Sequence, residues 1–421
     1  MIEMAKKNNG MLSPYRVFDL TEQGALLCGR ILADLGADVI KIEKPEGDPS
    51  RNMGPFYHDM PEPEKSLYWF VFNLNKRSIT LNMETADGQE LFKRLVKTAD
   101  FVIESFPPGY MEKLELSYSS LKEINPRIIL TSITPFGQTG PHKDFKAYDI
   151  VSWAMGGQMY TSGQLDRPPV RITTPQAGLN AALSAAAATL TAHYHREITG
   201  EGQYVDTSAQ AAECLTLANF IPYWEMYRIN LRRIGSYLVG RTEGVKQRTI
   251  YRCKDGYVAF LIMGGRWGAK SNRIVTEWMS SEGMAPKSMI EMNWDAFDIL
   301  KQEQKVQNEW EEAVERFFLT KTKAELYEGA LERRMMLAPV ASARDIVNNV
   351  QLREREWWLR VEHPELNATV NYPGFFVKAS ENPCEVRYRP PLIGEHNQKI
   401  YIEELGLSQE ELIYLKQAKV V

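Results

Sequence analysis

Alternating strand and helix patterns fill the first 140 residues, and this alternation restricts the possible folds more than any other feature of the chain. Strand-like runs rich in β-branched residues are predicted at 15–20, 37–45, 77–83, 101–109 and 127–137. Amphipathic helical patterns are predicted at 25–36, 84–100 and 111–126. Strands and helices that alternate at this spacing form parallel βαβ units, whose ligands bind beyond the carboxyl ends of the strands. The predicted fold class is therefore α/β, with a Rossmann-like large domain built on a parallel sheet.

The middle of the chain predicts a smaller α+β domain. The turn "CKDGY" lies between β-branched and aromatic runs and is a hairpin signal, and helical, charge-rich segments follow it through about residue 335. Helical periodicity returns in the final segment "QEELIYLKQAKVV". We therefore predict residues 1–224 as the N-terminal part of the large domain, 225–340 as an inserted small domain, and 341–421 as a part that returns to the large domain.

Composition and motifs exclude several classes of function. The sequence contains neither GxGxxG nor GxxxxGK[ST], so neither NAD nor ATP chemistry is indicated. A net charge of −4 gives no electrostatic reason to expect a nucleic-acid partner. No apolar run approaches the roughly 18 residues of a spanning helix, no secretory leader pattern is visible, and the four cysteines form no paired motif. We therefore expect a cytoplasmic protein that does not bind membranes. His193 and His195 fall on different helix faces, which argues against a metal pair.

Eight phrases in the sequence, in order from about residue 15 onward, resemble the class III CoA-transferases, which include the formyl-CoA and carnitine CoA-transferases. They are "LADLGADVIKIEKPEGD", "NLNKRSITLN", "PPGYMEKLEL", "NPRIILTSITPFGQTGP", "YDIVSWAMGG", "HREITGEGQYVDTS", "APVASARDI" and "PPLIGEHNQKIYIEELGLSQEEL". The resemblance implies a large α/β domain, a smaller domain and two interlocked chains. It also implies transfer of CoA from an acyl-CoA to a carboxylic acid, with CoA thioesters as substrates and no permanently bound cofactor.

The residue that carries this chemistry in the family is missing here. The resemblance implies an Asp nucleophile at the start of the Ala-rich helix that precedes the phrase "REITGEGQYVD". Counting back from Arg196 without a gap places this position on Gly178, and a small slip would place it on Gln176 or Ala177. No Asp or Glu occurs from residue 167 to residue 196, so the absence does not depend on the alignment. The family's racemases use a His where Tyr148 stands, which removes support for racemase chemistry.

Cationic and amide side chains near the predicted strand ends remain candidates for contact with CoA. By position in the family phrases, they are Lys44, Asn73, Asn75, Lys76, Arg77, Ser105, Lys113 and Thr134. Lys113 replaces an Arg and loses its bidentate fork, Ser105 stands where an Asn is common, and Thr134 stands where a Lys can occur. Each lysine alone is equally explained as a solvated surface charge. The family's glycine-rich lid corresponds to 235–247, where only Gly235, Gly240 and Gly244 remain.

Three functions are compatible with these residues. The favoured one is a subunit without a nucleophile in a hetero-oligomeric CoA-transferase, paired with a homologous Asp-bearing sister subunit. In this respect the chain is similar to the Asp-lacking subunit of succinyl-CoA:benzylsuccinate CoA-transferase from anaerobic toluene breakdown, which implies an acyl-CoA such as succinyl-CoA and an aromatic succinate as substrates. The alternatives are a homodimeric CoA-transferase that works without the usual Asp, and a CoA-binding pseudoenzyme or scaffold.

Overall fold

The computed structural model describes residues 10–238 and 245–421 and divides the chain into two compact units. The first unit comprises Met1–Met159, Arg171–Ala218 and Leu352–Val421, and the second comprises Tyr160–Val170 and Asn219–Gln351. Each unit is described by itself. The boundaries 224/225 and 340/341 stay predictions of where independently folding domains meet.

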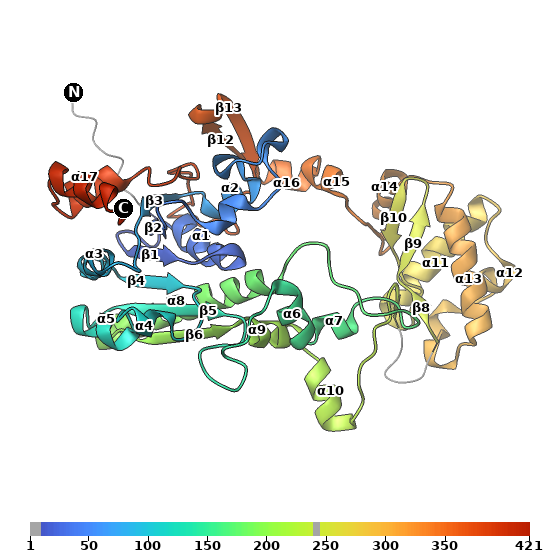
Figure 1. The fold of residues 1–421 in the computed structure, drawn as a ribbon. Helices are drawn as coiled ribbons and strands as arrows, with labels where there is room; N and C mark the ends of the chain where they lie inside the picture. The colour runs from blue at the N-terminus through green and yellow to red at the C-terminus, as the bar shows by residue number, and fades with distance from the viewer. Residues whose placement is uncertain (1–9, 239–244) are drawn as a thin grey trace. The chain divides into compact units, whose positions relative to one another are not determined.

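A six-stranded parallel sheet forms the centre of the first unit, with the strand order β3-β2-β1-β4-β5-β6 (Figure 1). The strands are β1 (Arg16–Leu20), β2 (Asp38–Glu43), β3 (Lys76–Thr80), β4 (Phe101–Glu104), β5 (Ile129–Thr134) and β6 (Tyr204–Ser208). The order is that of a doubly wound Rossmann sheet, so the predicted α/β class and parallel sheet are confirmed. β1 to β5 are buried almost throughout, which explains why apolar and β-branched residues prevail in β1, β2, β4 and β5, whereas β3 (KRSIT) also buries Lys76 and Arg77. The edge strand β6 was not predicted, because its sequence "YVDTS" is polar and mostly accessible.

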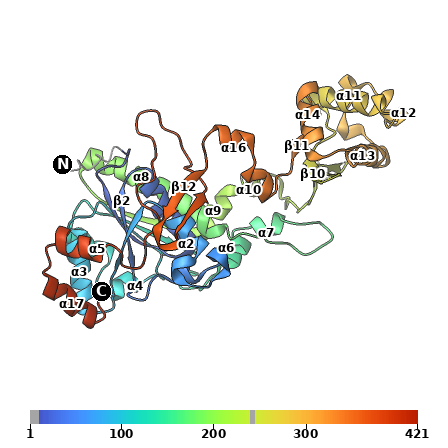
Figure 2. The same ribbon diagram turned by 90° about the horizontal axis from the view of Figure 1, so that it is seen from above.

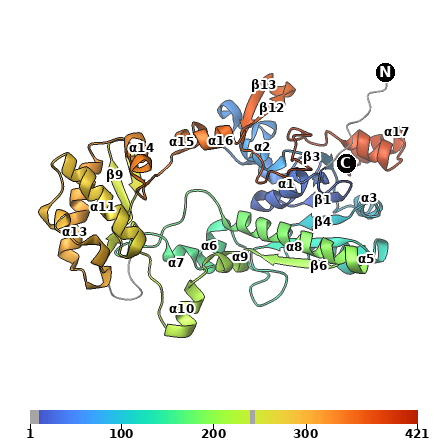
Figure 3. The same ribbon diagram turned by 180° about the vertical axis from the view of Figure 1, so that it is seen from behind.

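Helices cover both faces of this sheet (Figures 1 and 3). On one face α1 and α8 pack through small residues, including Ala181, Ala182 and Ala185, which let α8 approach the strands closely. On the other face α3, α5 and α17 bury Leu, Ile and Phe side chains. The helices of this unit are α1 (Leu26–Asp34), α2 (Leu67–Asn73), α3 (Ala86–Val96), α4 (Tyr110–Lys113), α5 (Tyr118–Ile124), α6 (Asp149–Met155), α8 (Ala177–Thr199), α9 (Ala209–Thr216) and α17 (Gln409–Gln417).

The C-terminal segment joins the core that the first residues build. Tyr401 donates a hydrogen bond to the Thr80 carbonyl at 2.7 Å, and the Asn397 side chain accepts one from the Thr80 N–H at 2.9 Å. Both residues lie in or beside the π-helical segment η8 (Gln398–Glu404), whose side chains enter the same apolar cluster as α3. A hairpin of β12 (Leu359–His363) and β13 (Ala368–Tyr372) precedes it. The last residues of the sequence therefore complete the sheet's second covered face.

The second unit holds a three-stranded antiparallel sheet packed on helices (Figure 2). Its strands, in the order β11-β10-β9, are β9 (Ile250–Cys253), β10 (Gly256–Ala259) and β11 (Ala338–Pro339). A separate pair is formed by β7 (Tyr237–Leu238) and β8 (Gln247–Arg248). Its helices are α10 (Phe220–Tyr227), α11 (Gly265–Ser281), α12 (Lys287–Ile290), α13 (Gln304–Phe318), α14 (Lys323–Arg333) and α15 (Ala343–Val347). Cys253 pairs with Gly256, so the hairpin predicted from "CKDGY" is confirmed.

Short elements complete the description. Two helices lie where the sequence passes between the units, namely α7 (Gln158–Thr161) and α16 (Val350–Glu354). The 3-10 segments are η1 (Gln23–Ala25), η2 (Pro49–Asn52), η3 (Tyr57–Asp59), η4 (Pro63–Lys65), η5 (Trp294–Ala296), η6 (Ile299–Lys301) and η7 (Pro364–Leu366). In the described parts of the chain, no helix combines the length and apolar character that a membrane crossing requires.

Candidate functional site

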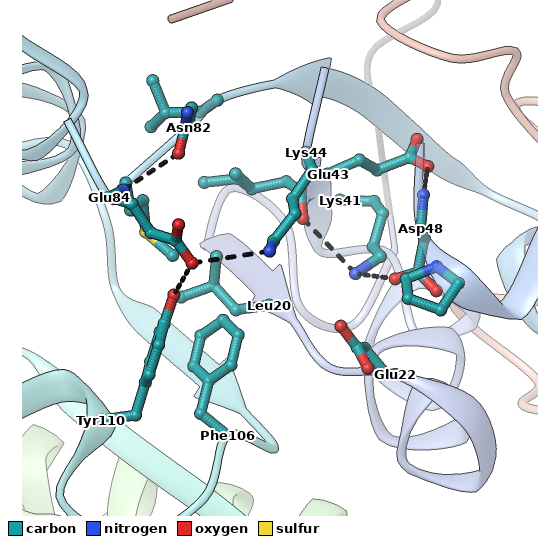
Figure 4. A pocket seen from close by; sticks show the side chains of 14 residues that line it. Leu20, Glu22, Lys41, Glu43, Lys44, Asp48, Asn82, Glu84, Phe106 and Tyr110 are labelled. Atoms are coloured by element: carbon teal, nitrogen blue, oxygen red, sulfur yellow. Dashed lines mark hydrogen bonds and ion pairs between the residues drawn. The ribbon is translucent and has the colours of Figure 1, made fainter. Parts of the chain in front are cut away.

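A cleft opens at the carboxyl edge of the parallel sheet, where the loops after four neighbouring strands meet (Figure 4). Glu22 follows β1, Lys44 follows β2, Glu84 follows β3, and Phe106 and Tyr110 follow β4. This edge is where ligands of open α/β sheets bind, because the strand-end loops leave a crevice between them. The cleft lies at the edge where the sequence predicts ligand binding, and its use as a binding site stays a prediction.

The mouth of the cleft is crossed by a polar bridge. The Lys44 ammonium lies 3.5 Å from the Glu84 carboxylate, and the Tyr110 hydroxyl donates a hydrogen bond to the same carboxylate oxygen at 3.1 Å. The hydrogen bond from Tyr110 and the charge of Lys44 lower the pKa of Glu84, while partial burial and Glu84 raise the pKa of Tyr110 to about 12. Phe106 and Tyr110 lie beside each other with ring centroids 4.7 Å apart. Glu84 is therefore ionised and links the β2, β3 and β4 loops.

A buried ion pair forms the floor of the cleft. Lys41 is 1% exposed, and its ammonium lies 2.8 Å from Asp48 and donates to the Thr21 carbonyl at 2.7 Å. Burial alone would raise the pKa of Asp48, but the charge and hydrogen bond of Lys41, together with the hydrogen bonds from Ser50, lower that pKa. Burial and the charge of Asp48 raise the pKa of the nearby Glu22. Sequence analysis did not single out Lys41; a lysine inside the apolar run "DVIKIE" is the signal that a buried partner exists.

Of the eight residues predicted to contact CoA, Lys44 lines this cleft. Two others support loops at the same edge: the Ser105 hydroxyl accepts a hydrogen bond from the Glu22 N–H at 2.9 Å, and the buried Thr134 hydroxyl accepts one from the Gly137 N–H at 2.9 Å. Lys113 is exposed on α4. Contact of these side chains with CoA stays a prediction.

The segment from Asn73 to Arg77 does not lie beside Lys44, because β3 begins at Lys76 and this segment is at the opposite, amino edge of the sheet. The expectation that this segment lies with Lys44 at the carboxyl ends of the strands, where ligands bind, is therefore wrong. Asn75 binds the C-terminal segment by accepting hydrogen bonds from the backbone N–H groups of Arg387 and Tyr388. Asn73 is buried as well.

The two cations of that segment are engaged in ion pairs. Lys76 is fully buried and lies 2.7 Å from the equally buried Asp19. Arg77 binds Asp38 and Glu404, at 2.5 and 2.6 Å. Any contact of these residues with CoA now rests on the family resemblance alone.

The start of α8, where the family resemblance predicts an Asp, carries a glycine with close neighbours. Gly178 lies in the first turn of this helix, and its N–H donates to the Asp149 carboxylate at 3.3 Å. A Cβ added to Gly178 would lie 3.1 Å from Gly24 Cα, because the loop of η1 packs directly on this turn. Glu213 lies nearby, buried, and accepts a hydrogen bond from Asn180 at 2.9 Å. The helix start therefore carries no reactive carboxylate of its own and is approached by those of α6 and α9.

Other motifs from the sequence are placed as follows. His396 accepts a hydrogen bond from the Ser78 N–H at 3.2 Å and so links the C-terminal segment to β3. His193 contacts Arg196 at 2.9 Å, and the described residues contain no group of three or more His, Cys, Asp or Glu that could hold a metal ion. The glycine-poor lid falls partly on 239–244, so Gly240 and Gly244 lie outside the described residues.

The buried carboxyl group of Glu104, at the end of β4, is expected to make the free energy of unfolding depend on pH. Burial raises its pKa from an ordinary 4.5 to about 7, although Ser132 and the Phe106 N–H, at 2.6 Å, bond to it. The folded state therefore holds this proton more tightly than the unfolded chain, and its contribution to stability is present below pH 4.5 and lost as the pH rises through 7. We expect Glu104→Gln to remove up to about 3 kcal/mol of the fall in unfolding free energy between pH 4 and pH 8. Urea unfolding of both proteins at several pH values measures this, and parallel pH curves would contradict it.

Comparison with known proteins agrees with this geometry. The family model CoA-transferase family III matches residues 12–397. The chain is 33% identical to the subunit BbsE of succinyl-CoA:(R)-benzylsuccinate CoA-transferase from Thauera aromatica, over 93% of each protein. It is also 33% identical to formyl-CoA:oxalate CoA-transferase from Streptomyces avermitilis, over 97% of this chain and 99% of the relative. The crystal structure of a CAIB/BAIF family protein from Brucella suis superposes with a TM-score of 0.79 at 27% identity, covering 93% of this chain and 98% of that one. The chain therefore belongs to the class III CoA-transferases, which move CoA between acyl-CoA thioesters and carboxylic acids.

Proposed function

We propose that this chain is the subunit without a nucleophile of a hetero-oligomeric CoA-transferase, and that a homologous sister subunit supplies the reactive Asp. The observation that carries the proposal is that no Asp or Glu occurs between residues 167 and 196, a stretch that includes the start of α8, where the family resemblance predicts an Asp at or near Gly178. Similarity to a protein named as one subunit of a CoA-transferase supports it. We further propose that the two chains interlock.

The proposed chemistry then belongs to the sister's site. Its carboxylate attacks the thioester carbonyl, which forms a mixed anhydride and releases CoA as thiolate. The thiolate then attacks the enzyme's own carbonyl in this anhydride, which releases the donor acid and leaves an enzyme–CoA thioester. The acceptor carboxylate attacks that thioester, expels CoA thiolate and forms a second mixed anhydride. The thiolate finally attacks the acceptor's acyl carbonyl, which gives the new acyl-CoA and frees the enzyme carboxylate. We propose an acyl-CoA such as succinyl-CoA as donor and an aromatic succinate such as benzylsuccinate as acceptor. This chain contributes structure and part of a binding surface.

The experiment is recovery of the tagged chain from its own host, followed by determination of its native mass and sequencing of any chain that co-purifies. We expect a stoichiometric complex with a homologue that has an Asp at the start of the helix equivalent to α8. A homo-oligomer with no such partner would overturn the proposal. The tag belongs at the N-terminal side, because Val420 and Val421 are buried in the core of the first unit.

A homomeric CoA-transferase is the second candidate, and Asp149 favours it. Its carboxylate accepts a hydrogen bond from the Gly178 N–H at 3.3 Å. It therefore lies beside the position where the family resemblance predicts the Asp. If the homomer transfers CoA through this group, Asp149→Asn should lower the rate by about 10³-fold or more. Under the favoured proposal the isolated chain is inactive before and after the change. A homomer that binds CoA without transferring it would instead identify a pseudoenzyme.

A further inference from the structure

We infer that Glu84 lowers the affinity of this chain for CoA. Its carboxylate pairs with the ammonium of Lys44 and repels the phosphates that this ammonium would otherwise attract. The inference rests on the proposed function in one respect: it takes the cleft at the carboxyl edge as the CoA-type cleft of this chain. Glu84 acts on CoA binding through its charge.

The geometry places Glu84 in the centre of the cleft mouth (Figure 4). One of its carboxylate oxygens faces both Lys44, at 3.5 Å, and the Tyr110 hydroxyl, at 3.1 Å. Lys44 and Glu84 are each about half exposed, at 51% and 57%, so an incoming anion can reach them. A phosphate that approached Lys44 would therefore meet a carboxylate within contact distance of the same ammonium.

The other charges of the lining do not offset this carboxylate. Lys41 is neutralised by Asp48 at 2.8 Å, and Glu43 is neutralised by Arg51 at 2.6 Å. The remaining formal charges of the cleft lining are Glu22, Glu84 and Lys44. Within the lining two carboxylates face one ammonium, and Lys113 on α4 is a nearby cation outside the lining whose charge also acts on Glu84. The lining itself is therefore unfavourable for a ligand with several phosphate charges, since like charges repel in a partly desolvated site.

The apolar part of the cleft is suited to a nucleotide all the same. Phe106 and Tyr110 present adjacent rings on which a flat base can pack, and Tyr110 is held in place by its hydrogen bond to Glu84. Glu84 thus orients the Tyr110 ring and pairs with the ammonium of Lys44. These contacts fit a cleft that keeps an aromatic surface for a base and has a reduced affinity for anions.

The test is calorimetric titration of CoA into the purified full-length chain and its Glu84→Gln variant at low ionic strength. Gln keeps the size and hydrogen-bonding ability of the side chain and removes its charge. We expect the variant to bind CoA about tenfold or more tightly than the unaltered chain. The gain should shrink at high salt, because exposed charges are screened over a few ångströms at about 1 M ionic strength.

The matched control is Glu123→Gln, which removes one negative charge from an exposed side chain of α5 outside the cleft lining. Thermal unfolding checks that both variants fold. Equal CoA affinity of the Glu84→Gln variant and the unaltered chain, or an equal gain in both variants, would overturn the inference. The co-purification experiment is independent of this result, because it reports on the partner and not on the cleft.

Discussion

Replacing the reactive Asp of the sister subunit with Ala is expected to lower the CoA-transfer rate of the hetero-oligomer by about 10³-fold or more, while Gly178→Ala in this chain leaves the rate within about twofold. The reason is that the covalent steps need a carboxylate at one helix start, and the helix start of this chain has none. The measurement is the steady-state rate of CoA transfer from succinyl-CoA by each purified complex.

The Gly178→Ala arm tests packing as well as chemistry. An added methyl group would lie 3.1 Å from Gly24 Cα, which requires a shift of a few tenths of an ångström, whereas Ala gains about 1 kcal/mol of helix propensity over Gly. The two effects oppose each other, so we expect a small change in melting temperature. A complex that keeps its full rate without the sister's Asp, or loses it with Gly178→Ala, would show that this chain's helix start takes part in the reaction.

Lys76→Ala is expected to destabilise the protein by about 3–5 kcal/mol, the largest effect on stability among the predicted site residues. Lys76 and Asp19 are both 0% exposed and lie 2.7 Å apart, and Lys76 also donates to the Leu26 carbonyl at 2.9 Å. Removing the ammonium leaves the Asp19 carboxylate buried without its charge partner. Denaturant unfolding, or the melting temperature if unfolding is irreversible, measures the loss.

The control for this prediction is Lys44→Ala, because Lys44 was predicted from the same family phrases but is 51% exposed. We expect this change to alter stability by no more than about 0.5 kcal/mol. Adding Asp19→Asn to Lys76→Ala should recover part of the loss, since the amide is neutral. Equal stability of Lys76→Ala and the unaltered protein would show that the buried pair contributes nothing to folding.

Much of the large unit could be predicted, because its buried strands are rich in β-branched and other apolar residues, although β3 begins with two cations. Five of the six strands of the sheet were found in this way, and the polar edge strand Tyr204–Ser208 was not. That the helix α8 carries no Asp or Glu before Glu197 could be read directly from the sequence.

The charged residues of the site could not be placed from the sequence. Lys76 pairs with a residue 57 positions away, and Arg77 with one 327 positions away, so nothing local distinguishes them from surface cations. The bridge at Glu84 was missed for the same reason, because its partners lie on the loops after β2 and β4. Family position suggested which residues matter, whereas only the fold shows that Asn75 and Lys44 lie at opposite edges of one sheet.

The packing of Ile400, Leu412 and Leu415 onto the sheet has a consequence for synthesis in the cell. The strands that these side chains cover are all made before residue 135, and ribosomes add roughly 5–20 residues per second. Until the C-terminal residues are made, α3 and α5 cover only part of that face, so apolar side chains of the strands stay exposed for on the order of tens of seconds. During that interval the nascent chain is open to misassembly.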